Sequence, residues 1–174
     1  FVEDNQAVDA FSEVMTRYER ALTFSKLNYD DKVDVLAGEN DGTLDFFLNV
    51  GTTEQPQFAE LMNANNPFYL LDVGDNSTPV FVDIDGDSDS DVFVGSLSGN
   101  VYYFENSGDG YTFKFDVNID DVSSHILEGI KSSKSSVPSF VDFDQDGDFD
   151  LVLGNASGTL QYYQNIGNYL SPMF

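Results

Sequence analysis

The sequence contains no cysteine and no tryptophan, and it has a single histidine, His125. The absence of cysteine excludes disulfides, thiolate nucleophiles and cysteine-based zinc sites. Basic residues are also scarce: 7 Lys and Arg against 31 Asp and Glu give a formal net charge of −24. A field of that sign repels nucleic acid and anionic lipid and attracts metal cations. No apolar run approaches the ~18 residues of a membrane span, so we expect neither a nucleic-acid partner nor membrane insertion.

What the sequence does contain argues for a folded β protein. Hydrophobic residues make up 41% of the 174 residues and aromatic residues 14%, which is enough for a core and argues against intrinsic disorder. The aromatic residues are all Phe or Tyr, and both types favour strands.

An internal repeat organises the whole chain. Three segments align without a gap: Leu22–Asn49, Pro79–Asn106 and Pro138–Asn165. The first two segments are 57 residues apart and the last two 59 residues apart, and a Phe follows nine residues after each terminal Asn. A fixed period of this length is typical of repeat architectures. We therefore predict one repeat domain over 1–174, with units of about 1–57, 58–114 and 115–174.

Each unit is predicted to contain four short strands. In the third unit the first three are Pro138–Asp142, Leu151–Leu153 ending at Gly154, and Leu160–Tyr163, and the fourth begins near the later Phe, as in Phe58–Leu61. Short strands in succession, separated by turn residues, are typical of an antiparallel meander, the blade of a β-propeller. The predicted fold class is all-β, with three tandem four-stranded antiparallel propeller-like blades and calcium loops between the first and second strands.

The predicted metal chemistry lies in these loops, which carry Asp at every second position. Carboxylates at loop positions one, three, five and nine can surround one ion, and position seven can add its backbone carbonyl. Oxygen ligands in this number suit Ca²⁺. An EF-hand is excluded because it needs Glu at position twelve between helices, where this chain has Val94 or Leu153. We expect two Ca²⁺ per chain, held by Asp83, Asp85, Asp87, Asp89 and Asp91, and by Asp142, Asp144, Asp146, Asp148 and Asp150.

The first unit departs from this pattern. Its equivalent positions are Lys26, Asn28, Asp30, Lys32 and Asp34. Because Lys26 replaces the first carboxylate, we predict that its ammonium group takes the place of the ion and pairs with Asp30 and Asp34. This degenerate loop is therefore expected to bind no Ca²⁺.

The chain resembles the FG-GAP/VCBS repeats of integrin α-subunit propellers and of large bacterial surface and secreted proteins. The matching residues run from Pro138 through Asp150-Leu151-x-x-Gly154 and continue through Gly158, Tyr162-Tyr163 and Asn165-x-Gly167. The resemblance implies calcium-stabilised blades, an extracellular or cell-surface location, and roles in adhesion, recognition or surface architecture. It implies no catalytic residues.

We therefore expect a structural or adhesive scaffold and not an enzyme. The expected partners are copies of the chain or neighbouring repeats, with glycans or surface proteins as further partners. A carbohydrate- or protein-binding propeller is the alternative, because propellers can bind ligands through loops and exposed aromatics. Asn76 and Asn155 lie in glycosylation sequons, which matter only if the source glycosylates.

The two ends of the repeat pattern carry a further expectation. Phe174 aligns with the start of a fourth strand, and Phe1-Val2-Glu3 aligns with Phe58-Ala59-Glu60. The first residue is Phe and not Met, so we expect a processed or excised piece. Either it belongs to a longer array, or neighbouring chains complete each other head to tail in a ring or filament.

Overall fold

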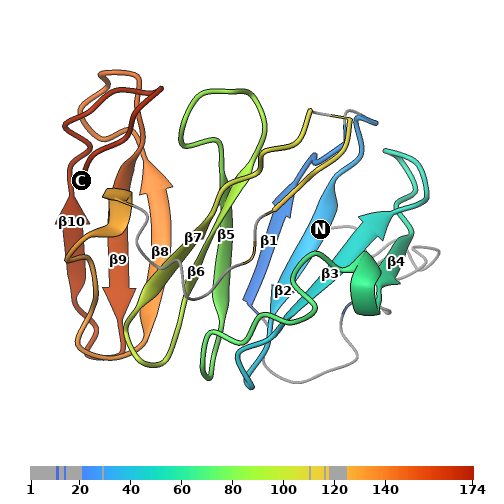
Figure 1. Cartoon of the computed structure of the whole chain (residues 1–174), viewed down its shortest axis with the longest axis horizontal. Helices are drawn as coiled ribbons and strands as arrows, with labels where there is room; N and C mark the ends of the chain where they lie inside the picture. Colours follow the sequence, from blue (N-terminus) through green and yellow to red (C-terminus); the bar gives the residue numbers. More distant parts are fainter. Residues whose placement is uncertain are drawn as a thin grey trace, which may run out of the picture.

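The computed structural model describes residues 21–28, 30–109, 111–115, 117 and 125–174, together with Phe11 and Val14. Over this part of the chain the fold is all-β, with three antiparallel sheets and two short 3-10 helices, η1 (Asn63–Asn65) and η2 (His125–Leu127) (Figure 1). The first sheet contains β1 (Ala21–Ser25), β2 (Asp34–Gly38), β3 (Leu44–Asn49) and β4 (Phe58–Leu61). The second contains β5 (Thr78–Val82), β6 (Asp91–Gly95) and β7 (Val101–Phe104), and the third β8 (Ser136–Val141), β9 (Asp150–Asn155) and β10 (Leu160–Tyr163).

The predicted meander is confirmed in each unit. Within every sheet the strands pair antiparallel in chain order. The predicted strand Leu160–Tyr163 has the bounds of β10, and the segment predicted from Phe58 is β4. The acidic loops join the first and second strands of their sheets, as the spacing predicts.

Over the described residues the three sheets have four, three and three strands, so the predicted four-stranded unit is confirmed in the first unit. In the second unit the described residues at the predicted place of the fourth strand form a bridge between Asn106 and Phe115. The three sheets do not form a closed propeller over the described residues. Phe1-Val2-Glu3, the predicted orphan strand, lies outside the described residues.

The second sheet lies between the first and the third (Figure 1), and both of its faces are buried. Because side chains alternate along a strand, Val92 and Val94 of β6 pack in one core with Leu36 of β2, while Phe93 packs in another core with Leu153 of β9. The first strands of the sheets also lie against each other, β1 against β5 and β5 against β8. The repeat thus buries its hydrophobic residues mainly between successive sheets.

The segment after η1 fills the core between the first two sheets. Phe68 is 1% exposed, and its ring centroid lies 6.4 Å from that of Phe46, 6.1 Å from that of Phe104 and 5.0 Å from that of Phe115. These aromatic contacts stabilise beyond simple area burial. The connection between repeats is therefore a structural part of the stack.

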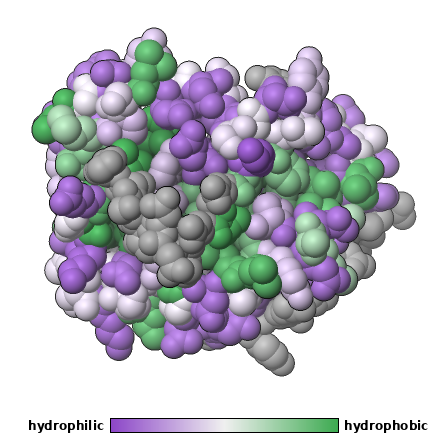
Figure 2. All heavy atoms as spheres, viewed as in Figure 1, coloured by the Kyte–Doolittle hydropathy of each residue, from purple (hydrophilic) through white to green (hydrophobic). Residues whose placement is uncertain are grey.

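Figure 2 shows one face of the molecule. In the view of Figure 2, hydrophilic residues cover most of the surface, with hydrophobic side chains visible between them. Among the residues that the structure describes, no helix has the length and apolar character needed to cross a membrane.

Candidate metal sites

A buried aspartate and an asparagine fasten each loop to its sheet. The last aspartate of the loop begins the second strand, and its Oδ1 accepts a hydrogen bond from the backbone N–H of the asparagine fifteen residues later. The donor–acceptor distance is 2.9 Å for Asp34 and Asn49, 2.8 Å for Asp91 and Asn106, and 2.8 Å for Asp150 and Asn165. All six residues are buried. This pair is present in the degenerate first unit too, so it belongs to the frame of the repeat.

The asparagine then closes the loop that leaves the third strand. Asn49 Oδ1 accepts hydrogen bonds from the N–H groups of Gly51 (3.0 Å) and Gln57 (3.1 Å). The same two bonds recur at Asn106, from Gly108 and Lys114, and at Asn165, from Gly167 and Met173. A single buried side chain in each unit therefore satisfies donors that the turn leaves unpaired.

The acidic loops share one turn geometry. Position six has a positive φ in all three units: +62° at Asp31, +77° at Ser88 and +99° at Gly147. Only glycine adopts this conformation without steric cost. The sharp turn predicted at Gly147 is confirmed, and the other two loops form it with residues for which it is strained.

Each intact loop gathers three carboxylates. In the second unit oxygens of Asp83, Asp85 and Asp87 all lie within 4.8 Å of one another, and in the third unit the same holds for Asp142, Asp144 and Asp146. Backbone N–H groups orient the first carboxylate: Gly86 N–H donates to Asp83 Oδ1 (2.8 Å), and Gly147 N–H donates to Asp142 Oδ2 (3.2 Å). Positions one, three and five therefore converge as predicted, and each of these two groups could hold a metal ion.

Buried oxygens without partners supply a test of whether a cation fits these loops. Three carboxylate oxygens are inaccessible to solvent and accept no hydrogen bond from the described part of the chain: Asp142 Oδ1, Asp89 Oδ1 and Asp148 Oδ1. Burying such an oxygen unpaired is costly. A hard cation bound to the loop would ligate it. The donor set contains only oxygens, so the residues present fit Ca²⁺ and not a soft metal.

The aspartates at position seven contribute more than their sequence position indicated. Only the backbone carbonyl was predicted to act there, but the side chains of Asp89 and Asp148 turn inward, each with a buried oxygen. Burial, followed by repulsion from Asp87 and the other loop carboxylates, raises the pKa of Asp89 to about 7. Burial and the charge of Asp146 also raise the pKa of Asp148. Both side chains are therefore candidate ligands whose ionised form a bound cation would favour.

The last aspartates lie outside the two groups of converging carboxylates. Besides their bonds to asparagine, the Oδ2 atoms accept bonds from tyrosine hydroxyls, Asp91 from Tyr103 (3.3 Å) and Asp150 from Tyr162 (2.9 Å). Burial, opposed by the N–H of Asn106, raises the pKa of Asp91 to about 8. Sequence reasoning predicted Asp91 and Asp150 as ligands, and it missed their part in fastening loop to sheet. The constant fifteen-residue spacing to asparagine was the available signal.

The degenerate first loop holds a different arrangement. Lys26 Nζ lies 3.3 Å from Asp31, while Lys32 Nζ lies 3.0 Å from Asp30 Oδ2 and the Lys32 N–H donates to Asp30 Oδ1 at 3.0 Å. Burial raises the pKa of Asp30, but the two hydrogen bonds from Lys32 outweigh it and lower the pKa. The ammonium group beside Asp30 is therefore that of Lys32, and the predicted pairing through Lys26 is corrected.

Asp34, the last residue of this loop, is fully buried and lacks the contact with a tyrosine hydroxyl that its equivalents have. Phe46 stands where the later units have Tyr103 and Tyr162. Asp34 Oδ2 has no hydrogen-bond partner among the described residues, and burial raises the pKa of the carboxyl. Asn28 Oδ1 is buried without a partner as well.

The two sequons lie in turns. Asn76 has a φ of +52°, and its N–H donates to the carbonyl of Asn40 at 2.9 Å. Asn155 ends β9, and its Oδ1 accepts a hydrogen bond from the N–H of Ser157 at 2.9 Å.

Comparison with protein families identifies the repeat. Residues 83–153 match the family model of the FG-GAP-like repeat. Over these residues the chain is similar to the FG-GAP-like repeat. The match begins at the first aspartate of one acidic loop and ends in the strand after the other, so both candidate metal sites lie within the FG-GAP-like segment. No curated protein was found to match the chain significantly.

Proposed function

We propose that this protein is a non-catalytic, calcium-binding repeat scaffold in which Ca²⁺ holds the acidic loops of the second and third units. The observation that carries the proposal is the convergence of three carboxylates in each of two loops with identical aspartate spacing. The loops lie within an FG-GAP-like repeat, a family of adhesion-type domains. One ion would be held by Asp83, Asp85 and Asp87 and the other by Asp142, Asp144 and Asp146. Asp89 and Asp148 would complete the coordination shells of the two ions.

The electrostatics of the chain support a bound divalent cation. A net charge of −24 opposes compaction unless counterions lie among the carboxylates. Burial and the neighbouring Asp87 raise the pKa of Asp85, so in the absence of metal this carboxyl resists ionisation. An ion bound between the carboxylates would offset their repulsion and tie the loop between the first two strands into one rigid unit.

The proposed setting is the cell surface or the extracellular medium. FG-GAP-like repeats are typical of such proteins, and extracellular modules bind Ca²⁺ with dissociation constants of roughly 10⁻⁴–10⁻³ M. Extracellular calcium would then keep the loops loaded. The proposed partners are neighbouring repeats or further copies of the chain, in a filament or larger array, or glycans and proteins of a surface.

A catalytic role is not proposed, because the chemistry of the chain is better explained by metal binding. The converging aspartates lie in loops with calcium-ligand spacing, and the single histidine, His125, lies in the short helix η2. Paired carboxylates of a glycosidase would face each other across a substrate cleft. Here the grouped carboxylates are neighbours within one loop.

Calcium titration by isothermal calorimetry tests the proposal. We expect two sites per chain, with Mg²⁺ a weaker competitor because it requires stricter octahedral geometry. Saturating Ca²⁺ at about 100 times the dissociation constant would stabilise the fold by about 2.7 kcal/mol per site. Chelation should therefore lower the melting temperature by roughly 10–20 °C. An unchanged melting temperature after chelation, with no heat of binding, would contradict the proposal.

A binding module is the second candidate function. Phe143 and Tyr162 are 60% and 51% exposed, and their ring centroids lie 5.5 Å apart on the third sheet. Exposed aromatic rings of this kind can stack on sugars. Saturable binding on a glycan array, lost in Tyr162→Ala, would favour a lectin over a scaffold.

A further inference from the structure

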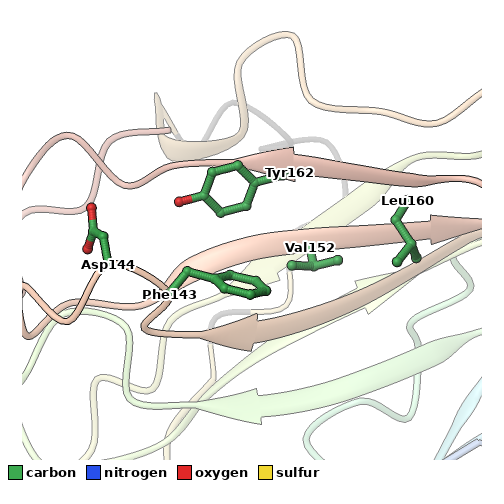
Figure 3. A pocket seen from close by; sticks show the side chains of 5 residues that line it. All are labelled: Phe143, Asp144, Val152, Leu160 and Tyr162. Carbon is green, nitrogen blue, oxygen red and sulfur yellow. The ribbon is translucent and has the colours of Figure 1, made fainter.

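The outer face of the third sheet carries an open apolar groove. Its volume is about 400 Å³, and it is lined by Phe143, Asp144, Val152, Leu160 and Tyr162. Figure 3 shows the groove along β9 and β10, with Asp144 at one end and Leu160 at the other. Leu160 is 76% exposed. Contiguous apolar side chains of this kind mark interaction surfaces on soluble proteins.

The repeat shows what covers the same face elsewhere in the molecule. The positions of Phe143, Val152 and Leu160 recur 59 residues earlier in the second sheet and a further 57 residues earlier in the first. There they are buried to 3% exposure or less, and the sheet that covers them is the next one in the chain. The equivalent residues are Ile84, Phe93 and Val101 in the second unit and Leu27, Leu36 and Leu44 in the first.

A glycine beside this face gives independent support. A Cβ on Gly38 would lie 2.1 Å from the carbonyl oxygen of Ser77, and one on Gly95 would lie 2.2 Å from that of Ser136. These glycines let the backbone of the next sheet approach closely. At Gly154, the third member of the series, the nearest atom to a Cβ is 3.7 Å away. Gly154 therefore lies at the position where the other two glycines contact the backbone of the next sheet, but it faces open surface.

A serine at the start of the next sheet bonds to the backbone of the sheet before it, and this contact indicates which sequence a docking partner would carry. Glu39 N–H donates to Ser77 Oγ (2.8 Å), and Ser77 Oγ donates to the carbonyl of Thr43 (2.7 Å). Ser136 repeats this contact in the next interface, accepting from Ser96 N–H (2.8 Å) and donating to the carbonyl of Asn100. Each serine begins a Ser-x-Pro sequence. In the third sheet the corresponding backbone groups belong to Asn155 and Thr159.

The first sheet of a second copy does not offer a matching free face. Its outer face forms a core of its own in which Val14 is fully buried. Phe11 also stacks on Phe58, with ring centroids 5.3 Å apart. Head-to-tail docking of two copies through this face would require Phe11 and Val14 to leave it.

We infer that the outer face of the third sheet is the docking surface for a further FG-GAP-like blade that enters with Ser-x-Pro. Aliphatic residues on the second strand of this blade, equivalent to Leu151 and Leu153, cover Phe143, Val152 and Leu160. Its serine bonds to the backbone at Asn155 and Thr159, and its chain passes over Gly154. The inference rests on the proposed scaffold function, of which it specifies the partner, but it does not depend on calcium binding.

The test extends the full chain by a second copy of residues 116–174, placed directly after Phe174. Phe174 aligns with Phe115, so this junction preserves the repeat. Because the chain has no cysteine, a single Leu160→Cys substitution in the original unit reports access to the groove through its rate of thiol labelling. We expect labelling to slow at least about tenfold in the extended chain, since modification then requires local opening. Leu70→Cys, at a residue that is 89% exposed and outside the groove, should label equally in both chains.

Gly154→Ala in the original unit is the matched control. The 174-residue chain has room for the added methyl group, so its melting temperature should change little. In the extended chain, combining Gly154→Ala with Leu160→Cys should restore fast labelling of the groove thiol, because the methyl group blocks the incoming backbone. Slow labelling despite Gly154→Ala would overturn the inference, as would fast labelling of the Leu160→Cys variant in the extended chain.

Two further results would also overturn it. One is limited proteolysis that removes the added unit, since a docked blade resists digestion. The other is protection of the groove thiol in the unextended Leu160→Cys chain together with a dimer mass in sedimentation, which would make a second copy the occupant. Calcium titration of the extended chain separates the two hypotheses: absent calcium binding contradicts the proposed function, whereas only the labelling result bears on the docking surface.

Discussion

The loop of the first unit and the loops of the second and third units share one frame but balance their charges differently. All three have a left-handed residue at position six and a last aspartate bonded to asparagine fifteen residues later. In the first loop the ammonium group of Lys32 lies beside Asp30. In each of the other two, three carboxylates converge, and neither salt bridge of the described residues reaches them. The comparison indicates that the frame forms with or without a basic side chain in the loop, whereas each acidic loop gathers carboxylates that could hold a cation.

The largest effect should come from removing one ligand of the third unit. Asp142→Ala should lower the calcium stoichiometry from two to one and cost about 2.7 kcal/mol at saturating calcium, the stabilisation from one site. Calorimetry and urea unfolding with and without Ca²⁺ would measure both quantities. Lys26→Ala, at the equivalent position of the first unit, is the control and should leave two sites. A loss of calcium binding in this control would remove the distinction between the loops.

Acidity should affect the metal-free protein next most strongly. The folded-state pKa values of Asp89 (about 7) and Asp91 (about 8) exceed the value of about 3.9 for an unfolded aspartate. Between these values the folded chain binds more protons than the unfolded chain, so its stability falls as the pH rises through 7 and 8. In a chelator, the melting temperature should be several degrees higher at pH 5.5 than at pH 8.5.

Calcium provides the control for this pH dependence. A bound ion keeps the aspartates of the second unit ionised, so at saturating Ca²⁺ the trend should flatten or reverse as protons compete with the metal. A melting temperature that rises with pH in the chelated protein would contradict the raised pKa values.

A smaller effect is expected from converting the first loop into the form of the others. In K26D/K32S the first carboxylate is supplied and the ammonium group beside Asp30 is removed. The buried oxygens of Asn28 and Asp34, which have no hydrogen-bond partner among the described residues, would then be available as ligands. Calorimetry should show a third, weaker Ca²⁺ site. The single variant K32S is the control: it should bind two ions and lose only about 0–1 kcal/mol, the contribution of an ion pair near the surface.

The smallest effect on stability is expected from substitutions at position six of the second and third loops. Ser88 has a φ of +77°, where the third unit has Gly147 at +99°. Ser88→Gly should relieve the strain and raise the free energy of unfolding by up to about 1 kcal/mol. Gly147→Ser should have the opposite sign. Equal effects of the same sign in urea unfolding would show that the two turns are not equivalent.

Much of the fold could be predicted because the same pattern of apolar strands and acidic loops recurs in three units. A continuous apolar run such as Val92, Phe93 and Val94 predicts a buried strand. The predicted fourth strand is β4 in the first unit, whereas in the second unit the described residues at this place form a bridge between Asn106 and Phe115.

The candidate sites were predicted in part, for a similar reason. The spacing of aspartates in one loop fixes which carboxylates converge, since neighbouring loop positions cannot lie far apart. Whether a side chain turns inward depends on contacts outside the loop. The pairing of Lys32 with Asp30, and the tyrosine hydroxyls that bond Asp91 and Asp150, were therefore not evident from spacing.

By itself the sequence determined the repeat, the order of the strands and the acidic loops with their oxygen-only side chains, because these follow from local periodicity and residue chemistry. The tertiary structure alone decided which lysine neutralises the first loop, which aspartates fasten the frame, and which sheet face stays open. Those features arise where side chains from distant strands meet. The same apolar triplet is a core in two sheets and a surface in the third, and only the position of a neighbouring sheet distinguishes them.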